Sequence, residues 1–409
     1  MSPIRIVILM CCAEVLSMTA FGTFSALIPT LLPEWHITNT QAGLISGVLF
    51  GGYMATVPIL TSLTDRIDAR RVYLLACVLA ALGALGFTFG ANGVMSALAF
   101  QALIGAGLAG TYMPGLKLLS DLIPEGLPRS RSVAFYTATF GLGSAMSLVI
   151  VGLAEPTLGW RAVFLISAFG PLAAAALVWL TLPAPPPAAH VETPPRLLDF
   201  RPVFRNRAAV GYILGYAAHC YELFGARSWI VAFLTFCATL QPIDHPLPWH
   251  PAWLIAVISP IVIPSSLIGN EIATRRGRRN VILTIMGASA LVGCVIGFLA
   301  PLPWYAAMVG YAIYIMLIMS DSSALTNGVI AEASAHLRGT TMAIYSFLGF
   351  GAALISPLVF GAVLDAAGGN TRVLAWGLAF ASLGVGGLGS IAVLVSRFRS
   401  RRAARAVAG

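Results

Sequence analysis

Apolar residues run along this chain in long blocks that polar residues interrupt only briefly. Twelve such blocks occur, at residues 6–32, 41–63, 72–92, 94–120, 130–154, 159–182, 208–236, 251–273, 279–300, 302–331, 339–364 and 371–396. Each has at least the length of about 20 apolar residues with which a helix crosses the hydrocarbon layer of a membrane. The pattern therefore predicts an all-α integral membrane protein with twelve transmembrane helices.

The composition excludes the main soluble classes. The chain is 58% hydrophobic and 10% charged, whereas soluble domains carry about 25% charged residues. The net charge of +9 does not indicate a nucleic-acid partner, because the arginines cluster in short segments between apolar blocks and form no basic stripe with aromatic residues. The expected surroundings of the chain are a lipid bilayer.

The arginines also predict the orientation. With the N-terminus inside, the inward segments carry 20 arginines and the outward loops carry only Arg161 and Arg372. Loops on the cytoplasmic side are enriched in Lys and Arg, so both termini are expected in the cytoplasm. We expect a multi-pass protein of the plasma membrane, which in bacteria is the inner membrane.

A proline-rich segment divides the chain near its middle. It contains "PAPPPAAHVETPPR" and cannot be a membrane helix. We interpret residues 183–207 as a semi-extended cytoplasmic linker. The linker joins an N-terminal bundle of six helices, residues 1–182, to a C-terminal bundle with a basic cytoplasmic tail, residues 208–409.

Features of the first half recur after a shift of about 208 residues. "DARRVYLL" matches "RGRRNVIL", "VAFYTATFG" resembles "MAIYSFLGFG", and "CAE" at Cys12–Glu14 matches "CYE" at Cys220–Glu222. Many secondary transporters are built from such internal repeats, with the substrate site at the repeat interface near the middle of the bilayer. The echoes therefore predict two pseudo-symmetric halves and a transporter.

The strongest motif is "TSLTDRIDARR" at residues 61–71. It resembles the loop G-x-x-x-D-R-x-G-x-R-R of the major facilitator superfamily of secondary transporters, although Thr61 and Asp68 stand where that family prefers glycine. "GNEIATRRGRR" at 269–279 resembles a degenerate second copy, and "GWRAVF" at 159–164 is similar to the family's entry to helix 6. The resemblance covers essentially the whole chain and implies alternating access between two six-helix bundles.

The residues of these loops predict a conformational latch at the cytoplasmic face. A carboxylate there can accept charge-assisted hydrogen bonds and interact with a helix N-terminus. Asp121 is a candidate partner for Arg70, and Lys117, four residues before Asp121, is expected to have a structural role beside it. The alternative is that these arginines only follow the positive-inside rule. The residues assigned to the latch are Asp65, Arg66, Arg70, Arg71, Asp121, Arg278 and Arg279.

Few ionisable groups lie inside the apolar blocks, where charges are costly and usually face the interior of the bundle. His219 and Glu222 are three residues apart and share a helix face, with Tyr216 one turn away. Arg227 lies about 140° around the helix from Glu222, so we expect it to meet another helix or a substrate anion. Asp321 stands in a polar run of the block 302–331, which we expect to line a cavity or to form hydrogen bonds between helices.

The repeat relates Glu14 to Glu222, and the resemblance implies that their helices line the central cavity. Buried carboxylates bind protons more readily, and His219 titrates near neutral pH when unperturbed. These three groups are therefore the candidate proton carriers; alternatively, the ionisable groups only pair with one another and lock helices together. The predicted pathway consists of Glu14, Tyr112, Tyr216, His219, Glu222, Arg227, Asp321 and Asn327.

The function expected from the sequence is secondary active transport of a small polar solute, with an organic or inorganic anion favoured by Arg227 and His219. Protons are the expected coupling ion, as symport or antiport. We expect a monomer that is not an enzyme and that uses no cofactor, no resident metal and no nucleic acid, because the chain lacks both an ATP-binding loop and hydrolase motifs.

Three alternatives stay open at this stage. The first is an efflux pump for drugs or metabolites, although "FGLGSAMSLVIVG" lacks the G-P-x-x-G-G pattern of many such antiporters. The second is a soft-metal importer for Cu(I), because Met10, Cys11, Cys12 and Cys220 lie near the acids, without a regular ligand spacing. The third is a channel.

Overall fold

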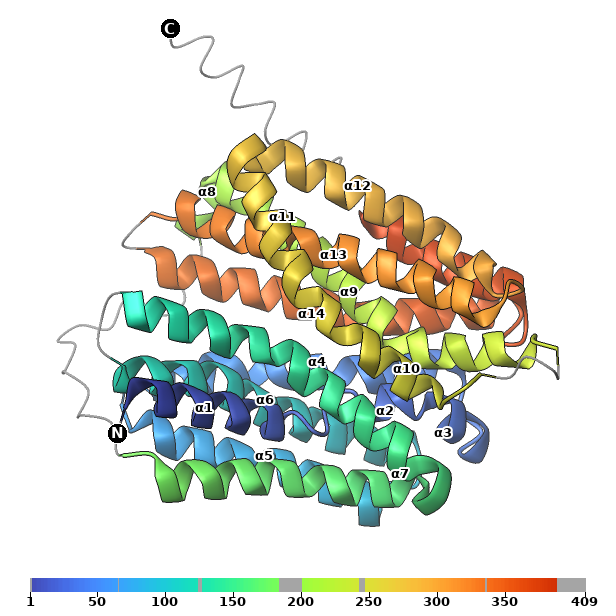
Figure 1. The fold of residues 1–409 in the computed structure, drawn as a ribbon, viewed down its shortest axis with the longest axis horizontal. Coiled ribbons are helices and arrows are strands. Elements are labelled where there is room, and N and C mark those ends of the chain that lie inside the picture. The colour runs from blue at the N-terminus through green and yellow to red at the C-terminus, as the bar shows by residue number, and fades with distance from the viewer. Residues whose placement is uncertain are drawn as a thin grey trace, which may run out of the picture. The chain divides into compact units, whose positions relative to one another are not determined.

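The computed structural model describes residues 2–64, 66–123, 127–183, 201–242, 247–334 and 337–387, and this part of the chain is helical without strands (Figure 1). The helices are α1 Pro3–Ser17, α2 Thr23–Ala26, α3 Ile28–Glu34, α4 Asn39–Leu63, α5 Ala69–Gly90, α6 Val94–Leu122, α7 Leu127–Thr181, α8 Arg201–Arg205, α9 Arg207–Thr239, α10 Pro251–Ile258, α11 Val262–Arg276, α12 Arg278–Ile296, α13 Trp304–Glu332 and α14 Arg338–Ala366. Two short 3₁₀ helices, η1 Ser259–Ile261 and η2 Gly297–Leu299, interrupt the series.

Eight helical stretches in the described residues are long and apolar enough to cross a membrane. They are Asn39–Leu63, Ala69–Gly90, Val94–Leu122, Arg131–Thr181, Pro251–Arg276, Arg278–Leu299, Trp304–Glu332 and Thr340–Ala366. A shorter apolar helix, Val373–Gly387, follows them. The chain is thus a multi-pass helical membrane protein, while the number twelve stays a prediction.

The first apolar block is not one helix. In place of a continuous span over residues 6–32, α1 ends at Ser17, turns follow, and α2 and α3 complete the segment. The Thr19 hydroxyl lies 2.6 Å from the carbonyl oxygen of Ser167 on α7 and 3.1 Å from that of Leu16. A side chain that hydrogen-bonds to backbone carbonyls in this way destabilises and bends a helix, in agreement with the break after Ser17. Hydropathy alone does not reveal such a break.

The chain divides into two compact units, each described here by itself. The first is Met1–His190, Ser228–Ala232 and Leu247–Pro260, and the second is Val191–Arg227, Phe233–Pro246 and Ile261–Gly409. The boundary between them falls inside the span Pro251–Arg276, directly after Pro260. As a result, α10 belongs to the first unit and α11 to the second.

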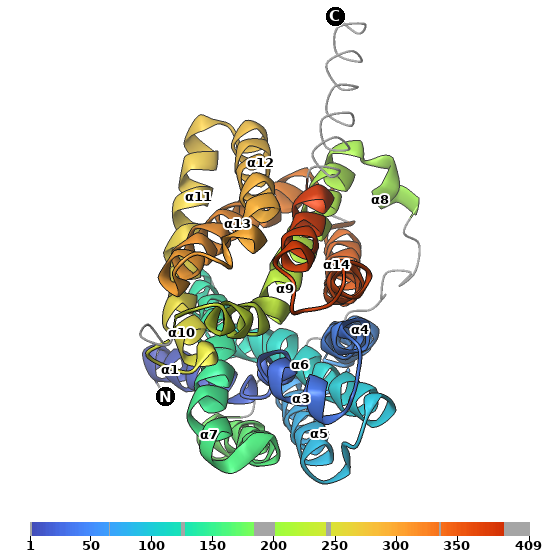
Figure 2. The ribbon, with the colours of Figure 1, turned by 90° about the vertical axis from the view of Figure 1, so that its right-hand side faces the viewer.

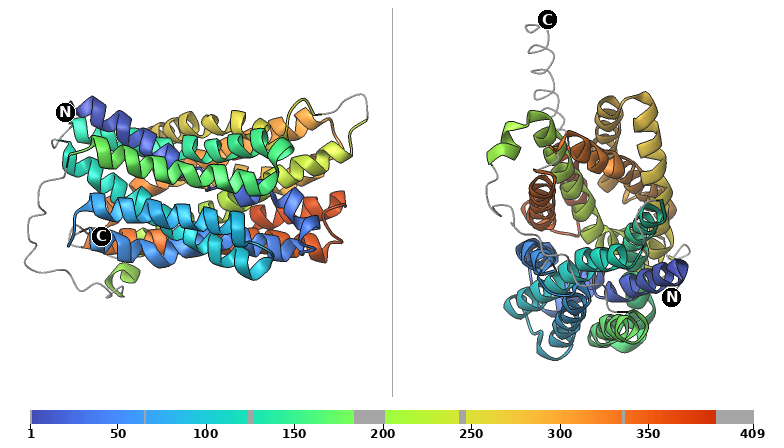
Figure 3. Two further views of the ribbon diagram at one scale, coloured as in Figure 1. Left: turned by 90° about the horizontal axis from the view of Figure 1, so that it is seen from below. Right: turned by 90° about the vertical axis from the view of Figure 1, so that its left-hand side faces the viewer.

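In the first unit α6 packs between α4 and α5, and α7 packs along α1 and α5. The element α7 consists of two helices joined by a kink at Gly159, where the backbone has a φ of 75°, and Figure 3 shows α1 beside it. Thr38 and Gln41 start α4 through a capping box. Gly105 of α6 lies against the backbone carbonyl of Leu49 on α4, so close that a Cβ atom would overlap the oxygen. Glycine therefore permits the backbones of α4 and α6 to cross in contact.

In the second unit α13 packs against α11 and α12 (Figure 2). Gly269 of α11 faces the carbonyl of Ser320 on α13 without room for a side chain. A buried cluster that includes Tyr212, Ile213, Met286, Leu325 and Tyr345 joins α9, α12, α13 and α14. These contacts place the polar side chains of α9, α12 and α13 in a common interior.

Candidate transport site

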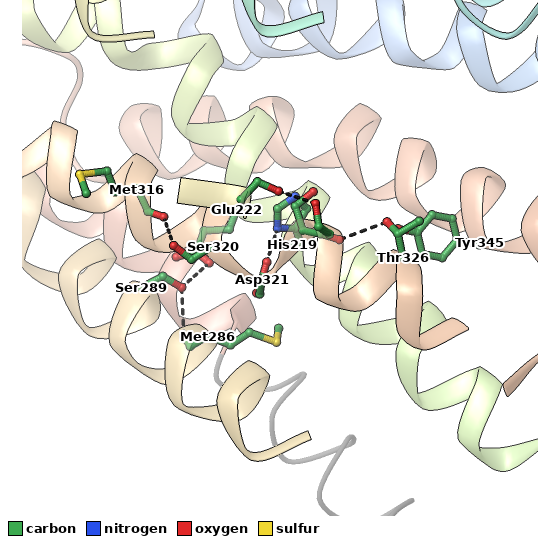
Figure 4. Close-up of polar contacts among 12 residues, drawn as sticks. His219, Glu222, Met286, Ser289, Met316, Ser320, Asp321, Thr326 and Tyr345 are labelled. Atoms are coloured by element: carbon green, nitrogen blue, oxygen red, sulfur yellow. Dashed lines mark hydrogen bonds and ion pairs between the residues drawn. The ribbon is translucent and has the colours of Figure 1, made fainter. Parts of the chain in front are cut away.

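Buried ionisable side chains of the second unit form one cluster between three helices (Figure 4). His219 and Glu222 come from α9, and Asp321 comes from α13. His219 Nδ1 lies 2.7 Å from Asp321 Oδ1. All three residues are at most 3% exposed. His219 and Glu222 share a helix, as predicted, but His219 takes its partner from α13.

Glu222 is held by a hydroxyl group. Ser289 of α12 lies with its Oγ 2.9 Å from Glu222 Oε2 and 3.1 Å from the carbonyl oxygen of Met286 (Figure 4). A serine hydroxyl has one proton to donate and lone pairs to accept with. It can donate to an ionised Glu222, or donate to the Met286 carbonyl and accept from a protonated Glu222. Both protonation states of Glu222 are therefore compatible with this arrangement.

Glu14 of the first unit has an equivalent environment. The Tyr136 hydroxyl of α7 lies 2.7 Å from Glu14 Oε2 and 3.1 Å from the carbonyl oxygen of Thr111. Glu14 is fully buried, and its Oε1 has no hydrogen-bond partner within the described part of the chain. Tyr136 can switch between the carboxylate and the Thr111 carbonyl as Ser289 can between Glu222 and Met286. The two acids related by the repeat thus share one chemical setting, each within its own unit.

Aromatic rings flank His219 in the second unit and Tyr136 in the first. In the second unit Tyr216 stacks on Tyr345 with ring centres 3.8 Å apart and on His219 at 5.8 Å. The Tyr345 hydroxyl lies 2.6 Å from Thr326 Oγ1 (Figure 4). In the first unit Tyr112 stacks on Tyr136 at 6.1 Å. The predicted residues Tyr216 and Tyr112 therefore lie beside His219 and beside the hydroxyl partner of Glu14.

Two predicted pathway residues stand apart from the His219–Asp321 pair. The Asn327 amide donates to Asn270 Oδ1 of α11 at 3.0 Å, in an exposed position. Arg227 lies two turns beyond His219 on α9, within electrostatic range of Tyr311 on α13. The structure thus brings His219, Asp321 and Tyr216 into contact, whereas Asn327 joins α11 to α13.

Two residues assigned to the cytoplasmic latch, Arg70 and Asp121, have separate partners in the described residues. Arg70 donates to the carbonyl of Trp179 on α7, and its guanidinium lies 5.0 Å from the centre of the Trp179 ring. Asp121 instead pairs with Lys117 one turn earlier on α6, at 3.2 Å, because residues four apart on a helix are neighbours. The described contacts of Arg70 therefore do not include Asp121.

The remaining latch residues lie at helix ends, except Asp65, which is outside the described residues. Arg66 and Arg71 are exposed, and Arg278 and Arg279 begin α12. Arg278 Nη1 lies 3.5 Å from the carbonyl oxygen of Asn327. Asp68, where the superfamily motif has glycine, accepts a hydrogen bond from the backbone N–H of Arg70 at 2.8 Å and so caps α5.

Sequence reasoning missed the hydroxyl partners Tyr136 and Ser289, as well as Tyr345. A signal existed for the two tyrosines, since "VAFYTATFG" and "MAIYSFLGFG" place Tyr136 and Tyr345 at equivalent positions of the repeat. Nothing in the sequence marks Ser289, because serine is common in membrane helices. Among the described residues no group of three His, Cys, Asp or Glu side chains is placed to hold a metal ion.

The buried pair of His219 and Asp321 should couple energetically. Each of the changes His219→Ala and Asp321→Ala leaves one buried polar group without its partner, which costs about 1–3 kcal/mol. The double variant should therefore be more stable than the sum of the single losses predicts. Thermal unfolding in detergent of the wild type and the three variants measures this; strictly additive losses would contradict the pairing.

An all-helical, multi-pass fold with buried acids between its spans is typical of membrane transporters. The sequence model of the Major Facilitator Superfamily matches residues 10–357. The chain therefore belongs to the Major Facilitator Superfamily, and the expectation drawn from its motifs is confirmed.

Relatives and solved structures agree with this assignment. The chain is 23% identical to Protein spinster homolog 3 of Danio rerio over 73% of its own length and 61% of that protein's. It is 26% identical to the Niacin transporter NiaP of Acinetobacter baylyi over 36% of its own length and 33% of that protein's. The matches thus span less than two thirds of these relatives.

Two solved structures share the fold. A bacterial homologue of the human lysosomal transporter Spinster, in an inward-facing and unoccupied conformation, has a TM-score of 0.72 at 16% identity, covering 97% of this chain and 95% of that one. The nucleoside transporter NupG has a TM-score of 0.76 at 15% identity, covering 96% and 100%. At these identities the likeness establishes the fold alone.

Proposed function

We propose that this protein is a proton-coupled secondary transporter that moves a small polar solute across the plasma membrane, the inner membrane in bacteria, by alternating access. The observation that carries the proposal is the setting of Glu14 and Glu222. Each is a buried carboxylate that touches a hydroxyl group with a second, backbone acceptor. These contacts accommodate both the ionised and the protonated acid, as a proton carrier requires.

The His219–Asp321 pair extends the proton-binding site of the second unit. His219 contacts the Asp321 carboxylate, and such a pair can hold one proton on either the ring nitrogen or the carboxylate oxygen. Glu222 lies within electrostatic range of Asp321. Protonation of any one of these groups therefore changes the charge felt by the others. We propose Glu14, Glu222 and His219 as proton carriers and Asp321 as the residue that orients His219.

The favoured solute is an organic anion with a planar ring. Arg227 supplies a positive charge two turns beyond His219 on the same helix, and the Tyr216–Tyr345 stack places aromatic rings beside His219. By their names, NiaP transports niacin and NupG transports nucleosides, and both are small polar molecules with planar rings. We further propose that the chain works as a monomer with both termini in the cytoplasm.

Uptake into proteoliposomes with an inward proton gradient tests this function. The solute panel should pair each carboxylate with its amide, for example nicotinate with nicotinamide, because the pair differs only in charge. We expect gradient-dependent accumulation of at least one carboxylate and little accumulation of its amide. Equal uptake of acid and amide would contradict the anion assignment, and large unitary currents in a voltage-clamped bilayer would show a channel.

The latch hypothesis makes a separate prediction. Asp65→Asn removes the negative charge beside Arg66, Arg70 and Arg71 but keeps the size of the side chain. We expect normal expression and thermal stability with strongly reduced uptake of the transported solute, because the cytoplasmic ends would no longer be held in one of the two states. Uptake equal to that of the wild type would exclude a role for Asp65 in the conformational cycle.

A further inference from the structure

A second titratable cluster lies in the first unit at the N-terminal end of α10, away from the buried acids. His250 Nδ1 accepts a hydrogen bond from the backbone N–H of Ala252 at 3.2 Å and so caps α10. His250 Nε2 lies 3.5 Å from Glu155 Oε2 on α7. Thr30 of α3 donates to the other oxygen, Glu155 Oε1, at 2.8 Å. The cluster therefore links α10 to α7 and α3.

These contacts fix the protonation state of His250. A ring nitrogen that accepts a hydrogen bond carries no proton, so the remaining proton sits on Nε2, toward Glu155. A second proton would occupy Nδ1, break the cap on α10 and place a positive charge at a helix N-terminus, where cations are unfavourable. In agreement, burial lowers the pKa of His250, and the Glu155 carboxylate only partly opposes this effect.

A 3₁₀ helix separates the segment that His250 caps from the rest of its span. The helix α10 packs along α7, where the backbone N–H of Trp253 comes within 3.0 Å of the position a Cβ of Gly152 would take. The 3₁₀ helix η1 with Pro260 ends α10, and α11 beyond it packs on α13 of the second unit. A 3₁₀ turn and a proline within a helical span are places where helices bend.

Other described charges at this end of the first unit are engaged elsewhere. Both oxygens of Glu34 on α3 lie 2.9 Å from the Trp160 indole nitrogen, and Arg161 Nη1 is 4.0 Å from Glu34. Arg161 also stacks over Trp160, 4.2 Å from the ring centre. Glu155 is therefore the charged group that faces His250 from the packed helices; Asp244 and His245 lie outside the described residues.

We propose that His250 is a proton-sensitive catch: its neutral form holds α10 against α7, and its protonation from the face predicted to be outward releases α10. The direction of the pH effect follows from the contacts, because only a neutral His250 ring can accept the hydrogen bond that caps α10. The stabilisation of the α7–α10 contact is fully present above the ordinary pKa of histidine and is lost as the pH falls. The catch goes beyond proton-coupled transport, since it makes opening of the outward end depend on external pH.

Distances between spin labels test the catch in the full-length protein. Leu158 on α7 and Trp249 before α10 are 62% and 60% exposed, and labels introduced there as genetically encoded amino acids leave the native cysteines in place. Between about pH 7.5 and about pH 5, across the titration range of histidine, we expect the population with long distances to grow. The ratio of the long-distance to the short-distance population should rise by no more than about tenfold per pH unit, the limit for binding of one proton.

Variants decide whether His250 causes the change. His250→Asn keeps a good helix cap but cannot titrate, so its distances should not change with pH. His36→Asn, at an exposed histidine of another loop, should respond like the wild type. Glu155→Gln keeps an acceptor for Thr30 without the charge and should shift the response to lower pH. A wild type without pH response, a response retained in His250→Asn, or an unshifted Glu155→Gln would each overturn the proposal.

Discussion

Replacing Glu222 by glutamine is expected to reduce proton-driven accumulation of the solute to the level of protein-free liposomes. The amide has the size of the carboxyl group and can still accept from Ser289, but it cannot carry a proton. Exchange of solute across the membrane without a proton gradient should persist, because the binding groups stay in place. Uptake and counterflow in the same proteoliposome preparation measure both quantities.

The matched control is Glu271→Gln. Glu271 lies on α11 in an exposed ion pair with Arg275, 2.6 Å apart, and its loss should leave both assays unchanged. Exposed pairs of this kind contribute at most about 1 kcal/mol to stability. Full gradient-driven uptake by Glu222→Gln would remove Glu222 from the mechanism and leave Glu14 as the candidate for the same test.

The second large effect is expected at the crossing of α4 and α6. Gly105→Val adds a branched side chain whose Cβ atom would overlap the Leu49 carbonyl oxygen, so the two helices must separate. Overpacking usually costs about 1–3 kcal/mol, and a backbone group yields less readily than a side chain does. We expect low yield and a strongly reduced unfolding temperature in detergent.

The control for this variant is Gly90→Ala at the end of α5. Its added carbon meets only the Phe100 ring, 3.1 Å away, and a side chain can shift by a few tenths of an ångström. This variant should unfold close to the wild-type temperature. A Gly105→Val protein with wild-type stability would show that α4 and α6 do not cross as closely as described.

Hydropathy was sufficient to predict a helical membrane protein, because a span in lipid must bury every backbone polar group within itself. The family was predicted from the "TSLTDRIDARR" motif together with the apolar spans and the central linker. The break in the first span was not predictable, since it depends on Thr19 reaching a carbonyl of α7, far along the chain. Such a contact leaves no periodic signal in the sequence.

The repeat predicted the two acids Glu14 and Glu222 but not their partners. The echo of Cys12–Glu14 in Cys220–Glu222 pointed to both acids, and the structure gives each of them a hydroxyl partner. Which side chains meet across helices is set by helix rotation and depth, so neither Ser289 nor the pairing of His219 with Asp321 follows from spacing. A pair within one helix does follow from spacing: Lys117 lies four residues from its partner Asp121 on α6.

The central claim is that solute and protons move together. The most direct measurement is the pH inside wild-type proteoliposomes, reported by an enclosed dye while a solute gradient is applied without any imposed proton gradient. Our account predicts that adding the transported solute changes the internal pH, and that an uncoupler dissipates this change. Solute entry at an unchanged internal pH would contradict it.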